Sequence, residues 1–409
     1  MDIWIFNHYA IAPGTSGITR HYDLARELVK MGHNVTIFAS SFDHQTRKEK
    51  HITENNVIKK EENYEGVHFV WIKTPPYRKN DWRRVLNILF YTIRTNNVIK
   101  ELQKHNPDVI IGSLMHPLAP ILAYLISSKK NCKFFFEERD LWPQSLVDLG
   151  KLSKKNPIVF LLSKLEMFLY KKADRIIVLF DKAIGYVESR GVNREKVIYL
   201  PNGVHLSKYD NPTPLPEEHN AIFEKLKGKF ICIYTGAHGL ANNLDAMLDA
   251  AKVLDAREKI HFVLVGDGPE KERLIKRKQN ENLSNITFLP PVSKEQVPEV
   301  LKRSNVGLIT MWDADVYKWG FSLNKSYDYM AAKLPIILKC HIKNNLIEKS
   351  GAVIRVDNSN EMAKEIENLY LNKGLLKDLG QKSREFVEQN NSWEKLASIL
   401  DEEINKYKT

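Results

Sequence analysis

The chain has 409 residues, of which 43% are apolar, and a formal net charge of +11 at pH 7. This length exceeds what one hydrophobic core usually serves and predicts two domains of about 200 residues each, while no apolar run approaches the roughly 18 residues that span a membrane. The three cysteines are isolated, which excludes a disulfide framework and a paired-cysteine zinc site, and with no signal peptide before the first apolar segment we expect a cytoplasmic protein.

Residues 1–200 alternate short apolar segments with amphipathic ones. The first apolar segment, Ile3 to Phe6, is followed by a loop with two glycines and then by an apolar stripe, Tyr22 to Val29, which predicts a helix. Because strands alternate with helices, we predict an N-terminal domain over residues 1–200 that holds a mostly parallel sheet with helices on both faces. Its further strands are expected at residues 35–39, 67–72, 109–112, 132–136, 176–179 and 197–200.

The basic excess belongs to this half, since residues 1–200 carry +10 of the net charge. It concentrates in residues 77–100 and 151–175, which also hold aromatic and aliphatic side chains. A helix over the first segment could lie on an anionic membrane surface, or it could pack its apolar stripe on the core and turn its basic side to solvent. Nucleic acid is not expected as a partner, because no recognition module accompanies the charge. The apolar stripe consists of Trp82, Val85, Leu86, Leu89 and Ile93, flanked by Arg83, Arg84 and Arg94.

The composition changes after Leu200. Residues 201–228 contain four prolines and are expected to form a linker. A second alternating set of strands, predicted at 230–234, 261–265, 286–289, 306–309, 336–338 and 352–356, defines a C-terminal domain over residues 229–390. Residues 391–409 are expected to form a final helix that could pack on either domain. The fold class is therefore α/β, with two doubly wound, Rossmann-like domains that face each other across a ligand cleft.

The segment from Trp319 to Leu338 carries the most suggestive chemistry. A loop leads to Asn324, an expected N-cap, and to a helix over residues 325–332. The free N–H groups at a helix start suit a diphosphate, to which Lys325 would add a positive charge. Asp328 follows about one turn, roughly 5 Å, further along, where a carboxylate could accept hydrogen bonds from ribose hydroxyls. An ordinary capped surface helix with solvated charges is the alternative.

Six segments stand in the order and at the spacing of one enzyme family. On these segments, which span nearly the full length, the chain resembles the bacterial family 4 glycosyltransferases of the GT-B fold, especially the group that builds O-antigen and capsule repeat units. The segments are PGTSGITRHYDLARELVKMGHNVTIFAS from residue 13, FEERDLWPQSLVDLG from 136, LPNGVH from 200, YTGAHG from 234, LVGDGPEKERL from 264 and LNKSYDYMAAKLPII from 323.

The resemblance implies that the C-terminal domain binds a UDP-sugar and that neither a metal nor another cofactor is needed. Asp328 stands where the family usually has a glutamate on the ribose, and Gly320 stands where it often has a second carboxylate. Many members also carry a basic pair after the YTG turn, which is absent here, so Lys325 is expected to be the main positive charge on the diphosphate. The implied donor-binding residues of this domain are Gly236, His238, Gly239, Leu289, Pro290, Gly320, Phe321, Ser322, Asn324, Lys325 and Asp328.

In the N-terminal domain, Gly14 and Gly17 would let the backbone approach a donor phosphate or the acceptor, although a two-glycine loop is also a common turn. His116 follows a predicted strand and would face the cleft, or serve a structural role. Asp140 is expected to orient the acceptor hydroxyl, with Glu138 and Arg139 as further acceptor contacts and Glu137 as another candidate acid. The expected catalytic residues are His116, Asp140 and Lys325.

These expectations combine into one function. The chain would be a retaining, metal-independent hexosyltransferase that moves a sugar from a UDP-sugar to a lipid-diphosphate-linked acceptor in capsule or O-antigen synthesis. The sugar would be an N-acetylated amino sugar, with a 6-deoxy sugar as one option, and the basic N-terminal domain would associate peripherally with the inner face of the cell membrane. Two alternatives remain from the sequence, namely a UDP-sugar epimerase of the same fold and a non-catalytic, membrane-bound assembly scaffold.

Overall fold

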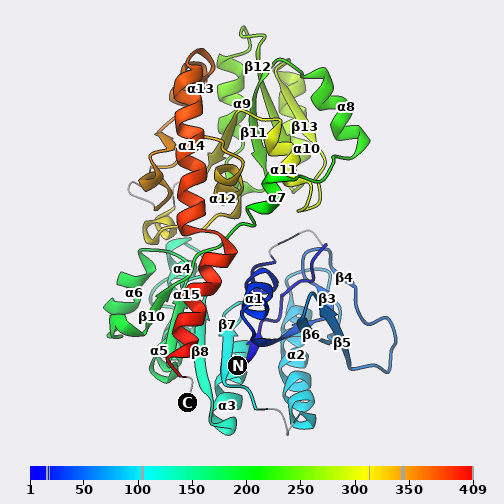
Figure 1. The fold of residues 1–409 in the computed structure, drawn as a ribbon, viewed down its shortest axis with the longest axis vertical. Helices are drawn as coiled ribbons and strands as arrows, with labels where there is room; N and C mark the ends of the chain where they lie inside the picture. Colours follow the sequence, from blue (N-terminus) through cyan, green and yellow to red (C-terminus); the bar gives the residue numbers. More distant parts are fainter. Residues whose placement is uncertain (15–16, 18, 103–105, 313, 342–345, 408–409) are drawn as a thin grey trace. The chain divides into compact units, whose positions relative to one another are not determined.

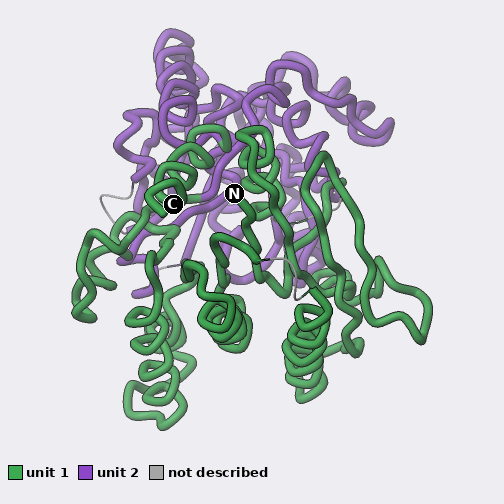
Figure 2. The backbone as a smooth tube through the Cα atoms, turned by 60° about the horizontal axis from the view of Figure 1, so that its bottom comes forward, with its two compact units in different colours: residues 1–201, 393–409 green, residues 202–392 purple. Residues whose placement is uncertain are grey.

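The computed structural model describes residues 1–14, 17, 19–102, 106–312, 314–341 and 346–407. The chain divides into two compact units, which Figure 2 shows in different colours: residues 1–201 with 393–409, and residues 202–392. The first unit is therefore discontinuous in sequence, because the last segment of the chain returns to it, whereas the second unit is one continuous stretch.

The described residues of the first unit form an eight-stranded sheet in the order β10-β9-β8-β7-β1-β2-β6-β5. All neighbouring strands are parallel except β5, which pairs antiparallel with β6 at one edge. Central strands are apolar on both sides because helices cover both faces. The strands are β1 (Asp2–Phe6), β2 (Asn34–Ser40), β5 (Lys59–Tyr64), β6 (Val67–Ile72), β7 (Val109–Ser113), β8 (Lys133–Glu138), β9 (Arg175–Val178) and β10 (Val197–Tyr199), beside a separate ladder of β3 (Phe42–Asp43) and β4 (Lys48–Glu49).

Helices α1 (Arg20–Lys30) and α15 (Trp393–Asn405) lie side by side on one face of this sheet, and α2 (Trp82–Glu101), α3 (Leu118–Lys130) and α5 (Pro157–Lys172) cover the other (Figure 1). The core under the first pair joins side chains of β1 to Leu28 of α1 and Leu400 of α15. The final helix thus packs on the first unit. The remaining helical elements of this unit are α4 (Gln144–Asp148), α6 (Ala183–Ser189) and the 3-10 turn η1 (Arg194–Lys196).

The second unit holds a six-stranded parallel sheet in the order β13-β12-β11-β14-β15-β16 among its described residues. Its strands are β11 (Phe230–Thr235), β12 (Ile260–Val265), β13 (Ile286–Leu289), β14 (Val306–Thr310), β15 (Ile336–Lys339) and β16 (Val353–Val356). Two separate apolar clusters, one on each face, show that this sheet is also covered on both sides. The predicted pair of doubly wound α/β halves is confirmed.

Helices α9 and α13 pack together on one face of the second sheet, and α12 packs against α14 on the other (Figure 1). The helices of this unit are α7 (Ser207–Asp210), α8 (Glu217–Lys225), α9 (Asp245–Val253), α10 (Lys271–Asn280), α11 (Val297–Lys302), α12 (Asn324–Ala331), α13 (Ser359–Leu371) and α14 (Lys373–Asn390). The 3-10 turns are η2 (Leu240–Asn242), η3 (Asp315–Trp319) and η4 (Leu346–Ser350). No helix in the described part of the chain combines the length and apolar character needed to cross a bilayer.

Two expectations about local structure are corrected. Residues 201–228 are not a linker, because Val204, Phe223 and Leu226 are buried in the core of the second unit. Asn324 is not the N-cap of α12: the helix begins at Asn324 itself, and the cap position is Leu323, whose side chain caps nothing.

Candidate active site

Two glycine turns pack on each other at the carboxyl ends of β11 and β12. Gly236 follows β11 with a φ of 141°, and Gly266 follows β12 with a φ of 152°. A Cβ at Gly266 would overlap the carbonyl oxygen of Gly236, and one at Gly268 would overlap the backbone of His238. The His238 N–H also donates to the carbonyl oxygen of Asp267 at 2.8 Å. Close backbone contact and positive φ therefore fix the shape of this turn.

The amine of Lys325, the second residue of α12, lies against the turn. Its Nζ donates hydrogen bonds to Tyr234 Oη (3.0 Å) and Asn242 Oδ1 (3.2 Å), and a Cβ at Gly236 would lie 3.2 Å from it. Within the described residues Lys325 forms no ion pair, and burial lowers its pKa from 10.5 to about 7. The amine is thus held by neutral partners, close to its titration point, and an anion at the turn would be its first counter-ion.

Asp328 lies one turn after Lys325 on the same helix. Its Oδ1 accepts a hydrogen bond from Tyr209 Oη at 2.6 Å, which fixes the carboxylate. In the loop before the helix, Ser322 Oγ accepts from the Asn202 N–H (2.9 Å) and the Ser322 carbonyl accepts from Asn202 Nδ2 (2.8 Å). Asn202 therefore holds the loop before the helix, and Tyr209 holds the carboxylate of Asp328. Both residues lie near the start of the unit, and neither was predicted from the sequence.

The structure constrains the other expected donor-binding residues of this unit to different degrees. His238 is fully buried, neither ring nitrogen has a hydrogen-bond partner among the described residues, and burial lowers its pKa to about 4, which leaves the ring neutral at pH 7. Gly320 has a φ of 92°, a conformation that favours glycine, and Phe321 packs on the core. Gly239 has an ordinary extended backbone and open space around it, so a glycine is not required there.

Leu289 and Pro290, which the family resemblance implies as donor-binding residues whose backbone reads the base, stand at the end of β13. The Leu289 carbonyl accepts a hydrogen bond from Lys271 Nζ at 3.1 Å, and the Pro290 carbonyl lies 2.9 Å from His219 Nε2. Both carbonyls are already bonded within the unit, so a nucleobase would share them through a second lone pair or use other backbone groups.

In the first unit, His116 follows β7 and pairs with a residue that the sequence analysis missed. His116 Nε2 lies 2.8 Å from Nδ1 of His8, which follows β1 and stacks on the ring of Tyr91 with centroids 4.3 Å apart. Burial lowers the pKa of His116 to about 3 and that of His8 well below its usual value, so both rings are neutral at pH 7. The other nitrogen of each ring is buried without a partner in the described residues. His116 is therefore suited to share a hydrogen bond and not to carry a charge.

The acids at the end of β8 and just after it lie in three different environments. Glu137 accepts hydrogen bonds from Arg20 Nε (2.9 Å), His21 Nε2 (2.7 Å) and the hydroxyl of a β7 serine, so it joins α1 to the sheet. Glu138, expected to contact the acceptor, is instead buried and bonded to the Tyr170 hydroxyl, and burial raises its pKa well above the usual range. That assignment is corrected, because a carboxyl that is covered by the protein and bonded to Tyr170 is not exposed to a substrate. Asp140 is exposed at the end of the strand and stays available.

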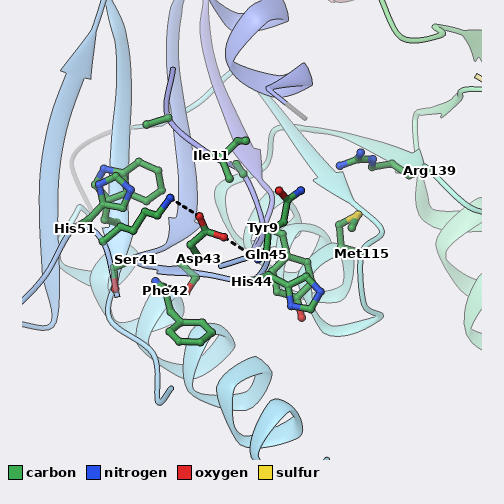
Figure 3. Close-up of a pocket in the computed structure, with 15 residues that line it drawn as sticks. Tyr9, Ile11, Ser41, Phe42, Asp43, His44, Gln45, His51, Met115 and Arg139 are labelled. Carbon is green, nitrogen blue, oxygen red and sulfur yellow. Dashed lines mark hydrogen bonds and ion pairs between the residues drawn. The ribbon is translucent and has the colours of Figure 1, made fainter. Parts of the chain in front are cut away.

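An open pocket, with about 650 Å³ of empty space that includes the solvent at its mouth, lies at the carboxyl edge of the first sheet (Figure 3). Segments that follow β1 and β2 form most of its wall, and Met115 and Arg139 contribute from the segments after β7 and β8. Gly14, with a φ of 78°, and Gly17 follow β1 nearby, and a Cβ at Gly17 would lie 2.9 Å from Gln45 Oε1 of the same pocket. Of the lining residues, only Arg139 was predicted as a site residue from the sequence. The other lining residues include Tyr9, Ser41, Asp43, His44, Gln45, Lys50 and His51.

Comparison with known proteins gives matches over both units. A model described as Glycosyltransferase Family 4 matches residues 15–208, and one described as Glycosyl transferases group 1 matches residues 229–372. An uncharacterized glycosyltransferase of Methanocaldococcus jannaschii is 23% identical over 96% of this chain and 95% of its own. The putative colanic acid biosynthesis glycosyl transferase WcaI of Escherichia coli is 22% identical over 73% of this chain and 74% of its own.

Among solved structures, Anabaena HepE in complex with UDP-glucose superposes with a TM-score of 0.68 at 11% identity, covering 99% of this chain and 100% of its own. At this identity the likeness concerns the fold alone. It extends over both units and therefore agrees with the two matches in sequence.

Proposed function

The chain belongs to the family 4 glycosyltransferases of the GT-B fold, and from that premise we propose that it transfers a sugar from a UDP-sugar to a lipid-diphosphate-linked acceptor. The observation that carries the donor half of the proposal is the position of Lys325. Its amine lies beside the glycine turn after β11, bonded only to Tyr234 and Asn242 among the described residues. A diphosphate is the ligand that such a cation and the start of a helix suit best.

The donor contacts follow from this placement. Lys325 and the first N–H groups of α12 bind the diphosphate, and Asp328, held by Tyr209, accepts hydrogen bonds from the ribose one turn away. Uridine as the base is supported by the complex of HepE with UDP-glucose. As the glycosidic bond breaks, negative charge grows on the leaving diphosphate, and the preorganised amine stabilises it more than it stabilises the intact donor.

The transfer is proposed to retain the anomeric configuration of the sugar. It is also proposed to need no divalent ion, because Lys325 supplies the positive charge that a metal would otherwise supply on the diphosphate. Transfer measured in excess chelator tests this point. Full activity is the expected result, and complete loss that added metal restores would contradict it. The proposed sugar is an N-acetylated amino sugar, and relatives such as WcaI support a role in the assembly of a surface polysaccharide.

The acceptor half of the proposal is supported by an apolar surface on the first unit. The stripe of α2 is not packed on the core, since the side chains of Trp82 and Ile93 are 64% and 57% exposed. On α5, Phe160 and Leu161 are 64% and 68% exposed. The two helices flank α3 on one face of the sheet (Figure 1), and Leu125 of α3 adds another exposed side chain between them.

Basic residues surround this apolar surface. Arg83 lies over the ring of Trp82 and Arg94 over that of Phe90 on α2, and Lys164 lies over Phe160 on α5. Exposed apolar side chains among cations favour binding at the interface of an anionic bilayer. We therefore propose peripheral association with the inner face of the cell membrane, where a lipid-linked acceptor would be found.

One set of reactions tests the proposal against its alternatives. A panel of UDP-sugars is incubated with lipid-diphosphate acceptors, with and without the acceptor, and the products are identified by mass spectrometry. Transfer only when both substrates are present is expected. Conversion of the donor alone would indicate an epimerase, and a calorimetric titration in which UDP fails to bind would indicate a non-catalytic scaffold.

The matched variants for this assay are Lys325→Met and Lys302→Met. Both substitutions remove a lysine from the second unit, but Lys302 is exposed on α11, away from the glycine turn. We expect Lys325→Met to lower UDP affinity by about tenfold or more, because charge-assisted hydrogen bonds to the diphosphate are lost, and Lys302→Met to leave it unchanged. Equal affinity in all three proteins would remove the basis of the donor assignment.

A further inference from the structure

The pocket of the first unit contains a cation that makes no direct ion pair within the described part of the chain. Arg139 extends from the end of β8 toward the pocket in Figure 3 and forms no hydrogen bond or ion pair with any described residue. The three acids beside it in sequence form no ion pair with it: Glu137 is bonded to Arg20 (2.9 Å) and His21 (2.7 Å), Glu138 is bonded to the Tyr170 hydroxyl, and Asp140 is exposed. A guanidinium stays protonated in proteins, and a partly desolvated charge without a counter-ion is unfavourable. The pocket therefore lacks one negative charge.

The other ionisable groups of the pocket do not supply it. Asp43 is paired with Lys50 at 2.7 Å, and its second oxygen accepts a hydrogen bond from the backbone N–H of Gln45, also at 2.7 Å. Burial and nearby arginines lower the pKa of His44 to about 4, so that ring is neutral at pH 7. Because Asp43 and Lys50 neutralise each other, the charge of Arg139 is not paired within the described lining of the pocket.

The rest of the wall is aromatic and polar. The ring of Tyr9 stacks on His8, with centroids 4.4 Å apart, and on His44, with centroids 4.6 Å apart, so a rigid aromatic stack borders the pocket. The side chains of Ser41 and Gln45 add hydroxyl and amide groups to the lining. Fixed polar groups beside a rigid wall orient a ligand, so the lining suits a small polar molecule.

We propose that this pocket binds the anionic part of the acceptor and that Arg139 forms a bidentate contact with its phosphate or carboxylate oxygens. A planar guanidinium fits both groups with two parallel hydrogen bonds. A phosphate would come from the diphosphate of a lipid-linked acceptor, and a carboxylate would come from an acidic sugar unit. The inference rests on the proposed transferase function, and it adds the charge of the acceptor and the residue that selects it.

The test uses three soluble probes of similar size: glucose 1-phosphate, glucuronic acid and glucose. Binding to the full-length protein is followed by NMR through the indole N–H signal of Trp71, which lines the pocket. We expect at least one charged probe to bind about tenfold more tightly than glucose, and Arg139→Gln to abolish that preference while glucose binding stays within twofold. Arg139→Lys should keep part of the preference, because it retains the charge but loses the planar fork.

The charged probe that binds better identifies the source, since the phosphate ester stands for the lipid diphosphate and the uronate for an acidic sugar. Lys129→Gln, which removes an exposed positive charge from α3 of the same unit, is the matched control and should behave like the wild type. Equal affinity of all three probes for the wild type, or an unchanged preference in Arg139→Gln, would overturn the proposal. A UDP titration of Arg139→Gln separates this outcome from failure of the transferase assignment, because the donor residues lie in the second unit and should bind UDP normally.

Discussion

The chemistry of Lys325 depends on its burial more than on its position in the sequence. In the folded protein its pKa is about 7, against 10.5 for an exposed lysine. At pH 8 the free amine is mostly neutral, and a bound diphosphate would favour the charged form. We predict that UDP binding at pH 8 takes up about one proton, which calorimetry in buffers of different ionisation enthalpy measures, and that Lys325→Met takes up none. Proton uptake that is the same in both proteins would contradict this role.

The lowered pKa of Lys325 also makes the stability of the folded protein depend on pH. The unfolded chain keeps the proton on Lys325 up to about pH 10.5, whereas the folded chain releases it near pH 7. Lys325 therefore lowers the free energy of unfolding by its full amount below pH 7, and this loss shrinks as the pH rises toward 10.5. We predict that Lys325→Met raises the midpoint of thermal unfolding at pH 6 and that the gain shrinks by pH 10. A gain that grows with pH would have the wrong sign.

Asp328 is expected to recognise the ribose through its hydroxyls. Asp328→Asn keeps the size of the side chain but replaces one acceptor oxygen with a donor, while the bond from Tyr209 can still reach the remaining oxygen. We predict that the wild type binds UDP more tightly than 2′-deoxy-UDP and that Asp328→Asn reduces this ratio by about fivefold or more. If the variant discriminates as well as the wild type, Asp328 does not contact the ribose.

The partners of these residues show which parts of the candidate site could be predicted from the sequence. Lys325 and Asp328 were found because their spacing on a helix is local information. Tyr234, Asn242 and Tyr209 were not, because they reach the helix only through the tertiary fold. Glu138 was misassigned for the same reason: a strand-end acid was expected at the surface, and only packing against Tyr170 shows that it is covered.

At the scale of elements, the turns after β11 and β12 are expected to tolerate almost no change. Gly266→Ala would add a Cβ that overlaps the Gly236 carbonyl oxygen, at a φ of 152°. We predict a loss of stability of about 2 kcal/mol or more, because relief requires backbone movement, together with weaker UDP binding. Gly239→Ala, in open space, is the control and should unfold like the wild type in thermal denaturation. Equal unfolding of the two variants would show that the turn adapts.

The apolar surface formed by α2 and α5 leads to a prediction about membranes. Ile93→Glu and Phe160→Glu place a negative charge among exposed apolar and basic side chains, which opposes both apolar insertion and attraction to anionic lipid. We predict that the double variant no longer sediments with vesicles that contain anionic lipid but still binds UDP. The control is Leu371→Glu, at a side chain that is 72% exposed in the second unit and should not affect sedimentation. Unchanged sedimentation of the double variant would exclude this surface.

The sequence predicted buried elements better than edge elements. Apolar runs located the central strands within one or two residues, since strands buried on both faces must be apolar. The edge strand β5 has the sequence KKEENY and was missed, because its ladder forms where polar side chains remain exposed. Residues 201–228 were read as a linker from their prolines, although the apolar side chains between the prolines pack on the second core.

At the scale of the whole molecule, the two units differ in how the chain completes them. The second unit is continuous over residues 202–392, whereas the first needs the helix that follows Ser392. The buried side chains of α15 are Trp393, Leu396, Ala397, Leu400 and Ile404. They cover α1 and the sheet, and polar contacts join Asp401 to His33 (2.6 Å) and Glu403 to Arg175 (2.8 Å). Burial of each large apolar side chain stabilises a fold by about 1.5–3 kcal/mol, so removal of the helix removes more than a typical domain can lose.

Deletion of residues 393–409 should therefore unfold the first unit and leave the second intact. We predict that the truncated chain shows a single thermal transition, still raised by UDP, while protease digests residues 1–201 rapidly. A fragment of residues 202–392 should bind UDP with the affinity of the full chain, because Lys325, Asp328 and their partners all lie within it. If the fragment folds but binds UDP far more weakly, the first unit contributes donor contacts. If the truncated chain resists protease, α15 is dispensable for the core that it covers.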